Sequence, residues 1–206
     1  MPKILIVFYS DDAIAGAMAN AVAAGAESVR FAEVEVRRVG VPLSHVSAGK
    51  APGQLDSTSE LDAYDAIVVG AAASEPIPAP LVALLDAAEV RKAHDRFADK
   101  VGSAFTASPA GPGELAAPSL VARLASLGMI LIPPVASGGT DAQLEQARSM
   151  GRRVAEVTAW VAHSLAHERE HRHGDGSPHD HGHSHGTGHS HEPGHPHEHD
   201  DPHSHA

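Results

Sequence analysis

The sequence predicts an α/β domain with a doubly wound, five-stranded parallel sheet and helices on both faces, followed by a disordered C-terminal tail. Short apolar runs rich in branched residues, at 4–8, 66–70 and 101–105, are typical of strands buried on both faces. Segments with helical spacing of apolar residues separate these runs. Because a crossover between parallel strands usually contains a helix, the alternation indicates a parallel sheet.

The first half of the chain supplies two strands and the helix between them. The run at 4–8 is too short for a helix and predicts a central strand. Ala-rich residues 11–28 follow a start signal at Ser10 and predict a helix. Residues 34–39 alternate valine with charged side chains, which predicts a strand nearer the sheet edge, and residues 40–54 are expected to be loop.

The second half continues the alternation. Ser57 and Glu60 have capping-box spacing before a short helix. Gly128 is expected to end a helix, and another helix starts near Asp141 and keeps apolar spacing as far as the first tail histidines. In order, the predicted elements are a strand at 66–70, a helix at 79–92, a strand at 101–105, a helix at 115–127, a strand at 129–132 and the final helix.

Composition excludes several classes of function. The formal net charge of -11 argues against nucleic acid and anionic membrane partners, which need Lys and Arg. The absence of cysteine leaves no disulfide, thiolate metal site or cysteine nucleophile, so metal chemistry must use His, Asp and Glu. With neither a signal peptide nor a membrane span in the sequence, we expect a cytoplasmic protein.

The sequence divides into a domain at 1–170 and a tail at 171–206, where Gly, Pro, Ser and Asp interleave with His. Imidazole suits borderline divalent metals, and it is largely uncharged at pH 7. We therefore predict that the C-terminal region binds several transition-metal ions, with Ni and Zn the leading choices. The alternative is a solubilising, pH-responsive polymer. The predicted ligands are His163, His167, His171, His173, His179, His181, His183, His185, His189, His191, His195, His197, His199, His203 and His205.

The first three of these histidines differ from the others. His163, His167 and His171 follow i,i+4 spacing, which places them on one face of the last helix, away from Val161 and Leu165. They could form a better-defined entry site for metal. The alternative is a solvated helix end, where histidines favour the helix C-terminus.

Three segments carry a resemblance to a known family. Residues 61–70 (LDAYDAIVVG), 124–133 (LASLGMILIP) and 3–10 (KILIVFYS) resemble the tryptophan-repressor-binding-protein family of NAD(P)H:quinone oxidoreductases. The likeness covers roughly residues 3–162. It implies a flavodoxin-like fold, FMN as cofactor, NAD(P)H and quinone as substrates, and a dimer or tetramer.

The same resemblance implies that FMN would lie in the loops after three strands, at the carboxyl edge of the sheet, where ligands of such sheets normally bind. The corresponding residues are Ser10, Asp11, Asp12, Ala13, Ile14, Ala71, Ala72, Ala73, Ser74, Thr106, Ala107, Ser108, Gly111 and Gly113.

These loops depart from the family's pattern. In the phosphate loop, Asp11 and Asp12 would repel a phosphate dianion unless they point away, and Ala13 replaces a glycine. Residues 70–76 (GAAASEP) lack the family's hydroxyls, arginine and aromatic, and no catalytic histidine can be carried over. The sequence therefore predicts a degenerate FMN site. The alternative is an active FMN-dependent quinone reductase with the tail as an accessory, because backbone amides supply much of a flavin site.

Overall fold

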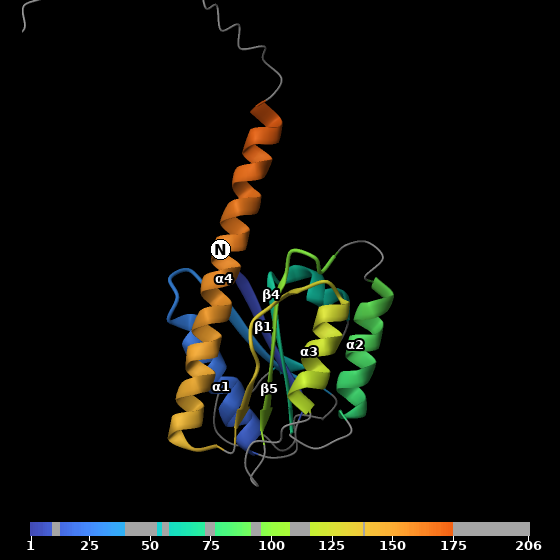
Figure 1. Cartoon of the computed structure of the whole chain (residues 1–206), viewed down its shortest axis with the longest axis vertical. Helices are drawn as coiled ribbons and strands as arrows, with labels where there is room; N and C mark the ends of the chain where they lie inside the picture. The colour runs from blue at the N-terminus through green and yellow to red at the C-terminus, as the bar shows by residue number, and fades with distance from the viewer. Residues whose placement is uncertain are drawn as a thin grey trace, which may run out of the picture.

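A computed structural model describes residues 1–9, 13–39, 53–54, 58–72, 77–91, 96–107, 116–137 and 139–174. Within these residues, strands and helices alternate along the chain and form a sheet flanked by helices (Figure 1). The strands are β1 (Lys3–Tyr9), β2 (Glu33–Arg38), β3 (Gly53–Gln54), β4 (Ala66–Ala72), β5 (Val101–Ala107), β6 (Ile130–Leu131) and β7 (Val135–Ser137). The helices are α1 (Ala13–Glu27), the 3₁₀ helix η2 (Thr58–Ala63), α2 (Ala79–Arg91), α3 (Ala116–Ser126) and α4 (Asp141–Gly174).

The sheet is parallel throughout, with strand order β3-β2-β1-β4-β5-β6, and β7 also pairs with β5. This arrangement confirms the predicted doubly wound α/β fold. Gly128 has φ +85 and follows α3, as expected of a residue that ends a helix.

Two short strands add to the predicted sheet. β3 lies in the stretch expected to be loop, and its pairing with β2 makes it the first strand of the order. The last predicted strand, at 129–132, contains only the short β6, and β7 follows as an additional strand after Pro133 and Pro134. Proline has no amide hydrogen to donate to the ladder, which accounts for the break.

Helices cover the two faces of the sheet separately. One core cluster joins alternate β1 residues such as Ile4 and Ile6 to α1 and α4. The other joins Leu5 and Val7 to α2, α3 and η2. Alternate residues of one strand thus enter opposite cores, which explains why β1 reads as a continuous apolar run.

Helices α1 and α4 touch through their backbones. A Cβ added at Gly151 would fall on the carbonyl oxygen of Val22, and one added at Gly25 would fall on the carbonyl oxygen of Arg148. Glycine is therefore required at both positions for this close approach.

Helix α4 continues beyond the sheet (Figure 1). We call residues 141–158 its docked part, because this segment contains its buried residues, from Ala147 to Thr158. We call residues 161–174 its projecting part, in which Val161 is still half-buried and His163 is exposed. The helix ends at Gly174, a few residues past the predicted domain boundary at 170. The predicted tail otherwise lies outside the described residues.

None of the helices in the described part of the chain is long and apolar enough to cross a membrane.

Candidate functional site

The strand order reverses between β1 and β4, and such a point carries the ligand crevice in doubly wound sheets. After β1, the chain forms β2 on one side of β1 and later forms β4 on its other side. In sheets of this kind, ligands bind at the carboxyl ends of the strands where the order reverses. Here that point lies at Tyr9 of β1 and Ala71 of β4, which are register partners.

The start of α1 lies at this edge, since α1 begins at Ala13 shortly after β1 ends. Gly139 lies beside it, because a Cβ added there would come 3.2 Å from Cγ2 of Ile14. The segment after β7 and the start of α1 therefore adjoin at the carboxyl edge. The first amides of a helix have no partner within the helix and suit a phosphate.

Six of the predicted cofactor-binding residues are described, and all of them lie at this edge: Ala13, Ile14, Ala71, Ala72, Thr106 and Ala107. The side chains of Ala71 and Ala107 are fully buried in the two cores, and Ile14 packs against one of them. Ala71 and Ala107 could contact a ligand only through their backbone, whereas the side chain of Ile14 is only partly buried. The other predicted residues lie outside the described part: Ser10, Asp11, Asp12, Ala73, Ser74, Ser108, Gly111 and Gly113.

Thr106 has an unusual environment. It pairs with Ala71 on one side and Ala136 on the other, next to the last residue of β5. The residue is completely buried, and its hydroxyl oxygen has no hydrogen-bond partner among the residues that the structure describes. An unsatisfied buried hydroxyl costs about 1–3 kcal/mol. A ligand that reached it from the crevice would remove that cost.

These features fit FMN. The start of α1 offers amides to a phosphate, Thr106 offers a hydroxyl at the neighbouring strand end, and the buried alanines leave backbone groups at the edge. The shifted pKa values among the described residues belong to groups away from this edge, and the catalytic residues stay unassigned.

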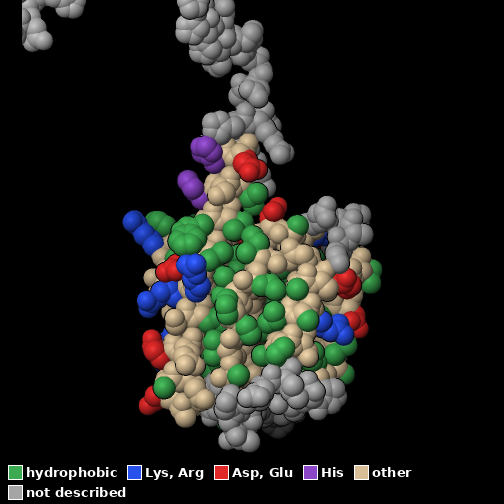
Figure 2. Space-filling model, viewed as in Figure 1, with side chains coloured by type: hydrophobic (Ala, Val, Ile, Leu, Met, Phe, Trp, Pro, Cys, Tyr) green, Lys and Arg blue, Asp and Glu red, His purple; other side chains and the backbone are tan. Residues whose placement is uncertain are grey.

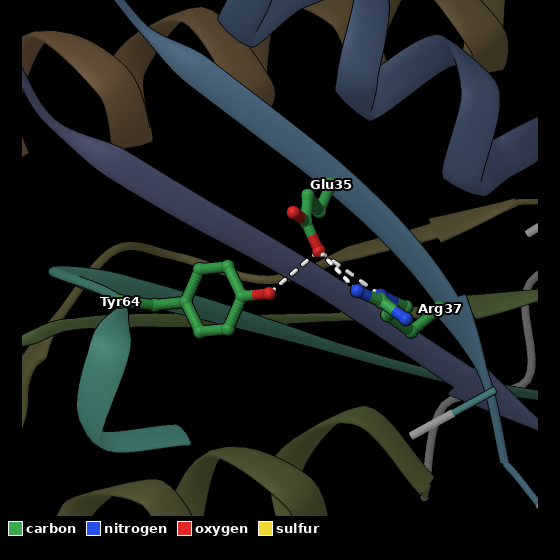
Figure 3. Close-up of polar contacts among 3 residues, drawn as sticks. All are labelled: Glu35, Arg37 and Tyr64. Carbon is green, nitrogen blue, oxygen red and sulfur yellow. Dashed lines mark hydrogen bonds and ion pairs between the residues drawn. The ribbon is translucent and has the colours of Figure 1, made fainter. Parts of the chain in front are cut away.

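A polar cluster lies elsewhere on the sheet, on the side of α2 and α3 (Figure 3). The phenol of Tyr64 donates to Oε2 of Glu35 at 2.6 Å, and Arg37 donates to the same oxygen at 3.0 and 2.7 Å. Glu35 is level with Leu5, in the middle of β1. The cluster thus ties the residue after η2 to β2 and is not part of the crevice.

Its contacts shift the pKa values of its members. Hydrogen bonds from Tyr64 and Arg37 lower the pKa of Glu35, because they favour the carboxylate. Burial, followed by the hydrogen bond to Glu35, raises the pKa of Tyr64 to about 12. The hydrogen bond with Glu35 also raises the pKa of Arg37. These shifts mark a structural ion pair, since the three side chains bond to one another and their shared oxygen belongs to Glu35, in the middle of β2.

Polar contacts connect neighbouring segments at the amino edge of the sheet. The half-buried Lys100 donates to the carbonyl oxygens of Asp62, at 3.1 Å, and of Tyr64. Burial lowers the pKa of Lys100, against the attraction of Asp65 and Asp62. The Lys3 amide donates to Asp65 Oδ2 at 2.8 Å. These polar groups at the amino edge are paired with one another. At the carboxyl edge, in contrast, the buried hydroxyl of Thr106 has no partner among the described residues.

The predicted metal ligands are only partly described. His163 and His167 are exposed on the projecting part of α4, at the far end from the crevice, where Figure 2 shows histidine side chains in purple. His171 and His173 belong to the same helix by their backbone. The described side chains contain no group of three or more possible ligands. Outside the described residues lie His179, His181, His183, His185, His189, His191, His195, His197, His199, His203 and His205.

Gly139 and the Glu35 cluster were not predicted from the sequence. The alternation in β2 already placed Glu35 and Arg37 on one face, but nothing in the local pattern pointed to Tyr64 as their partner. Gly139 lies far from Ile14 in the sequence, so only the folded chain brings the two together.

The chain is similar to several proteins named NAD(P)H dehydrogenase (quinone). It is 35% identical over 141 residues to the protein from Acidovorax ebreus, covering 64% of this chain and 70% of that protein. Identity is 33% with the protein from Paraburkholderia phymatum and 34% with that from Azorhizobium caulinodans, with the same coverage. No family model matches the chain.

Solved structures support the fold. A flavodoxin from the domain Archaea has a TM-score of 0.58 at 23% identity, over 76% of this chain and 99% of that one. The flavodoxin of Megasphaera elsdenii has a TM-score of 0.55 at 17% identity, over 74% of this chain and 98% of that one. The fold is thus flavodoxin-like. The chain covers 70% of the length of relatives that are 35% and 34% identical to it. It therefore belongs to the NAD(P)H dehydrogenase (quinone) family.

Proposed function

We propose that this chain is an FMN-dependent NAD(P)H:quinone oxidoreductase whose cofactor lies in the crevice at the carboxyl ends of β1, β4 and β5. The observation that carries the proposal is the buried, unpartnered hydroxyl of Thr106 at this edge. The similarity to NAD(P)H dehydrogenases (quinone) supports the choice of cofactor and substrates.

In this proposal the protein binds and orients the cofactor, which, when bound, supplies the chemistry of accepting a hydride from NAD(P)H and passing reducing equivalents to a quinone. The first amides of α1 hold the phosphate. Thr106 donates one hydrogen bond to a polar atom of the cofactor. The backbone at Ala71 and Ala107 borders it, because their methyl groups are occupied in the cores.

We further propose that FMN is held weakly, in keeping with the degenerate site predicted from the sequence. Asp11 and Asp12 lie within the expected phosphate loop and place negative charge near a dianion. Replacing either aspartate with asparagine should therefore tighten FMN binding.

The test is an FMN titration of the full chain, followed by flavin fluorescence, together with NAD(P)H oxidation in the presence of a quinone. Thr106→Val removes the hydroxyl and should weaken FMN binding up to about tenfold, the equivalent of one hydrogen bond. The matched control is Thr158→Val, since Thr158 is also a buried threonine but donates to Val154 at 2.7 Å, within α4. Absence of FMN binding at any concentration would overturn the proposal.

A second proposed function is transition-metal binding by the histidine-rich C-terminal region. The supporting observation is that His163 and His167 are exposed on the part of α4 that leaves the domain. Ni or Zn content of the full chain, purified without a chelating column, should exceed that of a variant ending at Gly174. Both core clusters end before that residue, so the shorter chain retains its core. Equal metal content in the two proteins would contradict metal binding by the histidines after Gly174.

Finer expectations complete the proposal. The resemblance of residues 61–70 and 124–133 supports membership of the tryptophan-repressor-binding-protein branch, and with it a dimer or tetramer. Light scattering on the purified protein measures the oligomeric state. We also propose a cytoplasmic location, which cell fractionation can check.

A further inference from the structure

We propose that His163 and His167 form a discrete two-histidine site for one transition-metal ion, most strongly Cu(II), on the projecting part of α4. The site rests on the proposed metal binding of the C-terminal region, but it is separate from the sites of the tail. It would be filled first, because its ligands are held by a helix.

The geometry of the helix brings the two imidazoles together. Both histidines lie within the continuous helix α4, and both are exposed. Side chains at i and i+4 are neighbours on one face, with Cβ atoms roughly 5–6 Å apart. Two ring nitrogens at that spacing can each reach a common ion at about 2.0–2.1 Å. Water can fill the remaining coordination positions, because the face is open to solvent.

The helix also reduces the entropy lost on binding. A ligand pair in an unstructured segment must fix its backbone when the ion binds, which costs conformational entropy at each residue. Here the backbone is already fixed, since Thr158 is buried and Val161 is half-buried just before His163. His171 lies two further turns from that anchor. The pair nearest the domain should therefore bind first.

The ligand type favours a particular class of ion. Two imidazoles without a thiolate suit Cu(II), Ni(II) and Zn(II), and the affinity of such a site rises toward Cu(II) in the usual order of divalent metals. The pair supplies only two ligands and so does not impose a complete coordination geometry on the ion. Selectivity among divalent metals should therefore follow this order.

Trp160 provides a local reporter. It is the chain's one tryptophan, its exposure is 60%, and Arg153 stacks on its ring at 5.1 Å. Trp160 is three residues from His163 and seven from His167, spacings that place all three on one face of the helix. A paramagnetic Cu(II) ion held by the pair should quench its fluorescence.

The position of the site makes it independent of the crevice. From Asp141, where α4 begins at the carboxyl edge, to His163 the helix rises roughly 33 Å. Metal bound there cannot touch a cofactor in the crevice of the same chain. FMN affinity should therefore not change when the pair is occupied.

The experiment is a titration of the full chain with Cu(II) below one equivalent, followed by Trp160 fluorescence. The main variant is S164H/H167S, which keeps the number of histidines but places the pair at i,i+1, where side chains do not face each other. The matched control, S184H/H185S, makes the same exchange in the tail. We expect early quenching in the wild type and the control, and at least a tenfold higher midpoint in the main variant.

His163→Gln is the second variant, and it should show the same loss. Circular dichroism and thermal unfolding check that the variants fold. If early quenching is unchanged in S164H/H167S and His163→Gln, the two-histidine site is wrong, even if total Cu(II) uptake shows that the tail binds metal. If one Cu(II) ion binds and quenches Trp160 but no further Cu(II) binds at saturation, the two-histidine site is supported. The proposal that the tail binds metal is then wrong.

Discussion

The docked and projecting parts of α4 belong to one continuous helix but have opposite surroundings. The docked part lies against α1, with backbone contact at Gly151 and buried residues such as Val154 and Ala155. The projecting part has exposed residues such as His163 and Ala166, and among its described side chains only Val161, Ala162 and Leu165 are half-buried. Helical periodicity runs through both parts. The comparison teaches that the backbone contact at Gly151, and not the apolar pattern, marks where this helix is held by the domain.

The largest effect should come from Gly151→Ala. In a free helix this change favours folding by about 0.5–1 kcal/mol, because alanine is the better helix former. Here the added methyl would fall on the carbonyl of Val22 and force α1 and α4 apart. We expect a loss of about 3 kcal/mol in the free energy of unfolding, measured with urea.

Gly16→Ala is the matched control. It lies in α1, and a Cβ added there meets nothing within 4 Å. This variant should gain about 0.5–1 kcal/mol. If the two glycine variants changed stability in the same direction, backbone contact would not explain how α4 is held.

The next effect compares two alanines of α4. Ala155 is fully buried, so Ala155→Gly should cost about 2 kcal/mol, from lost helix propensity and lost burial of a methyl. Ala166 is exposed in the projecting part, and Ala166→Gly should change global stability by less than about 0.5 kcal/mol. It should instead speed amide hydrogen exchange around residue 166. A large global loss in Ala166→Gly would show that the projecting part also supports the fold.

Removing a polar contact outside α4 should change the free energy of unfolding less, and the change should depend on pH. Tyr64→Phe removes the hydrogen bond to Glu35 and should cost about 1 kcal/mol at pH 7. The pKa of Glu35 is lowered in the fold, so its contribution is present above its ordinary pKa of 4.5 and is lost as the pH falls through the folded value. The pKa of Tyr64 is raised from 10.0 to about 12, so its contribution is complete below 10.0 and is lost as the pH rises through about 12.

The difference between wild type and Tyr64→Phe should therefore shrink at both ends of the pH range. Urea unfolding at a series of pH values measures it. A difference that stayed constant across the range would mean that the hydrogen bond contributes nothing.

The smallest effect should occur where the two parts of α4 meet. Arg153→Gln removes the cation from the Trp160 ring and should cost about 0.5 kcal/mol or less, because both side chains are exposed. The emission of Trp160 should change measurably even though stability hardly does. An unchanged emission spectrum would show that the two side chains do not remain stacked in solution.

Much of the fold could be predicted from the sequence, because its strands are buried on both faces and read as apolar runs. Residues 4–8, 66–70 and 101–105 all lie within strands of the structure. Two-residue β3 and three-residue β7 were missed, since such short segments carry no periodicity and depend on the neighbouring strand for their conformation.

The candidate site could be predicted only in outline. Ala71 and Thr106 lie at the carboxyl edge, as the sequence predicted, but the sequence could not show that Thr106 is buried without a partner among the described residues. Burial of a single hydroxyl depends on packing between distant segments. For the same reason, sequence reasoning could not foresee that Gly139 lies beside Ile14.

The divided outer strand has a consequence for how copies of this protein behave at high concentration. An outermost strand with regularly spaced free amides can pair with the edge of another sheet and seed aggregates. Here Pro133 and Pro134, both exposed, interrupt that row between β6 and β7. At the opposite edge of the sheet, β3 has only two residues available for pairing with another strand. In the described part of the sheet, both edges are thus poor templates for strand addition, and copies of the chain should resist edge-to-edge pairing.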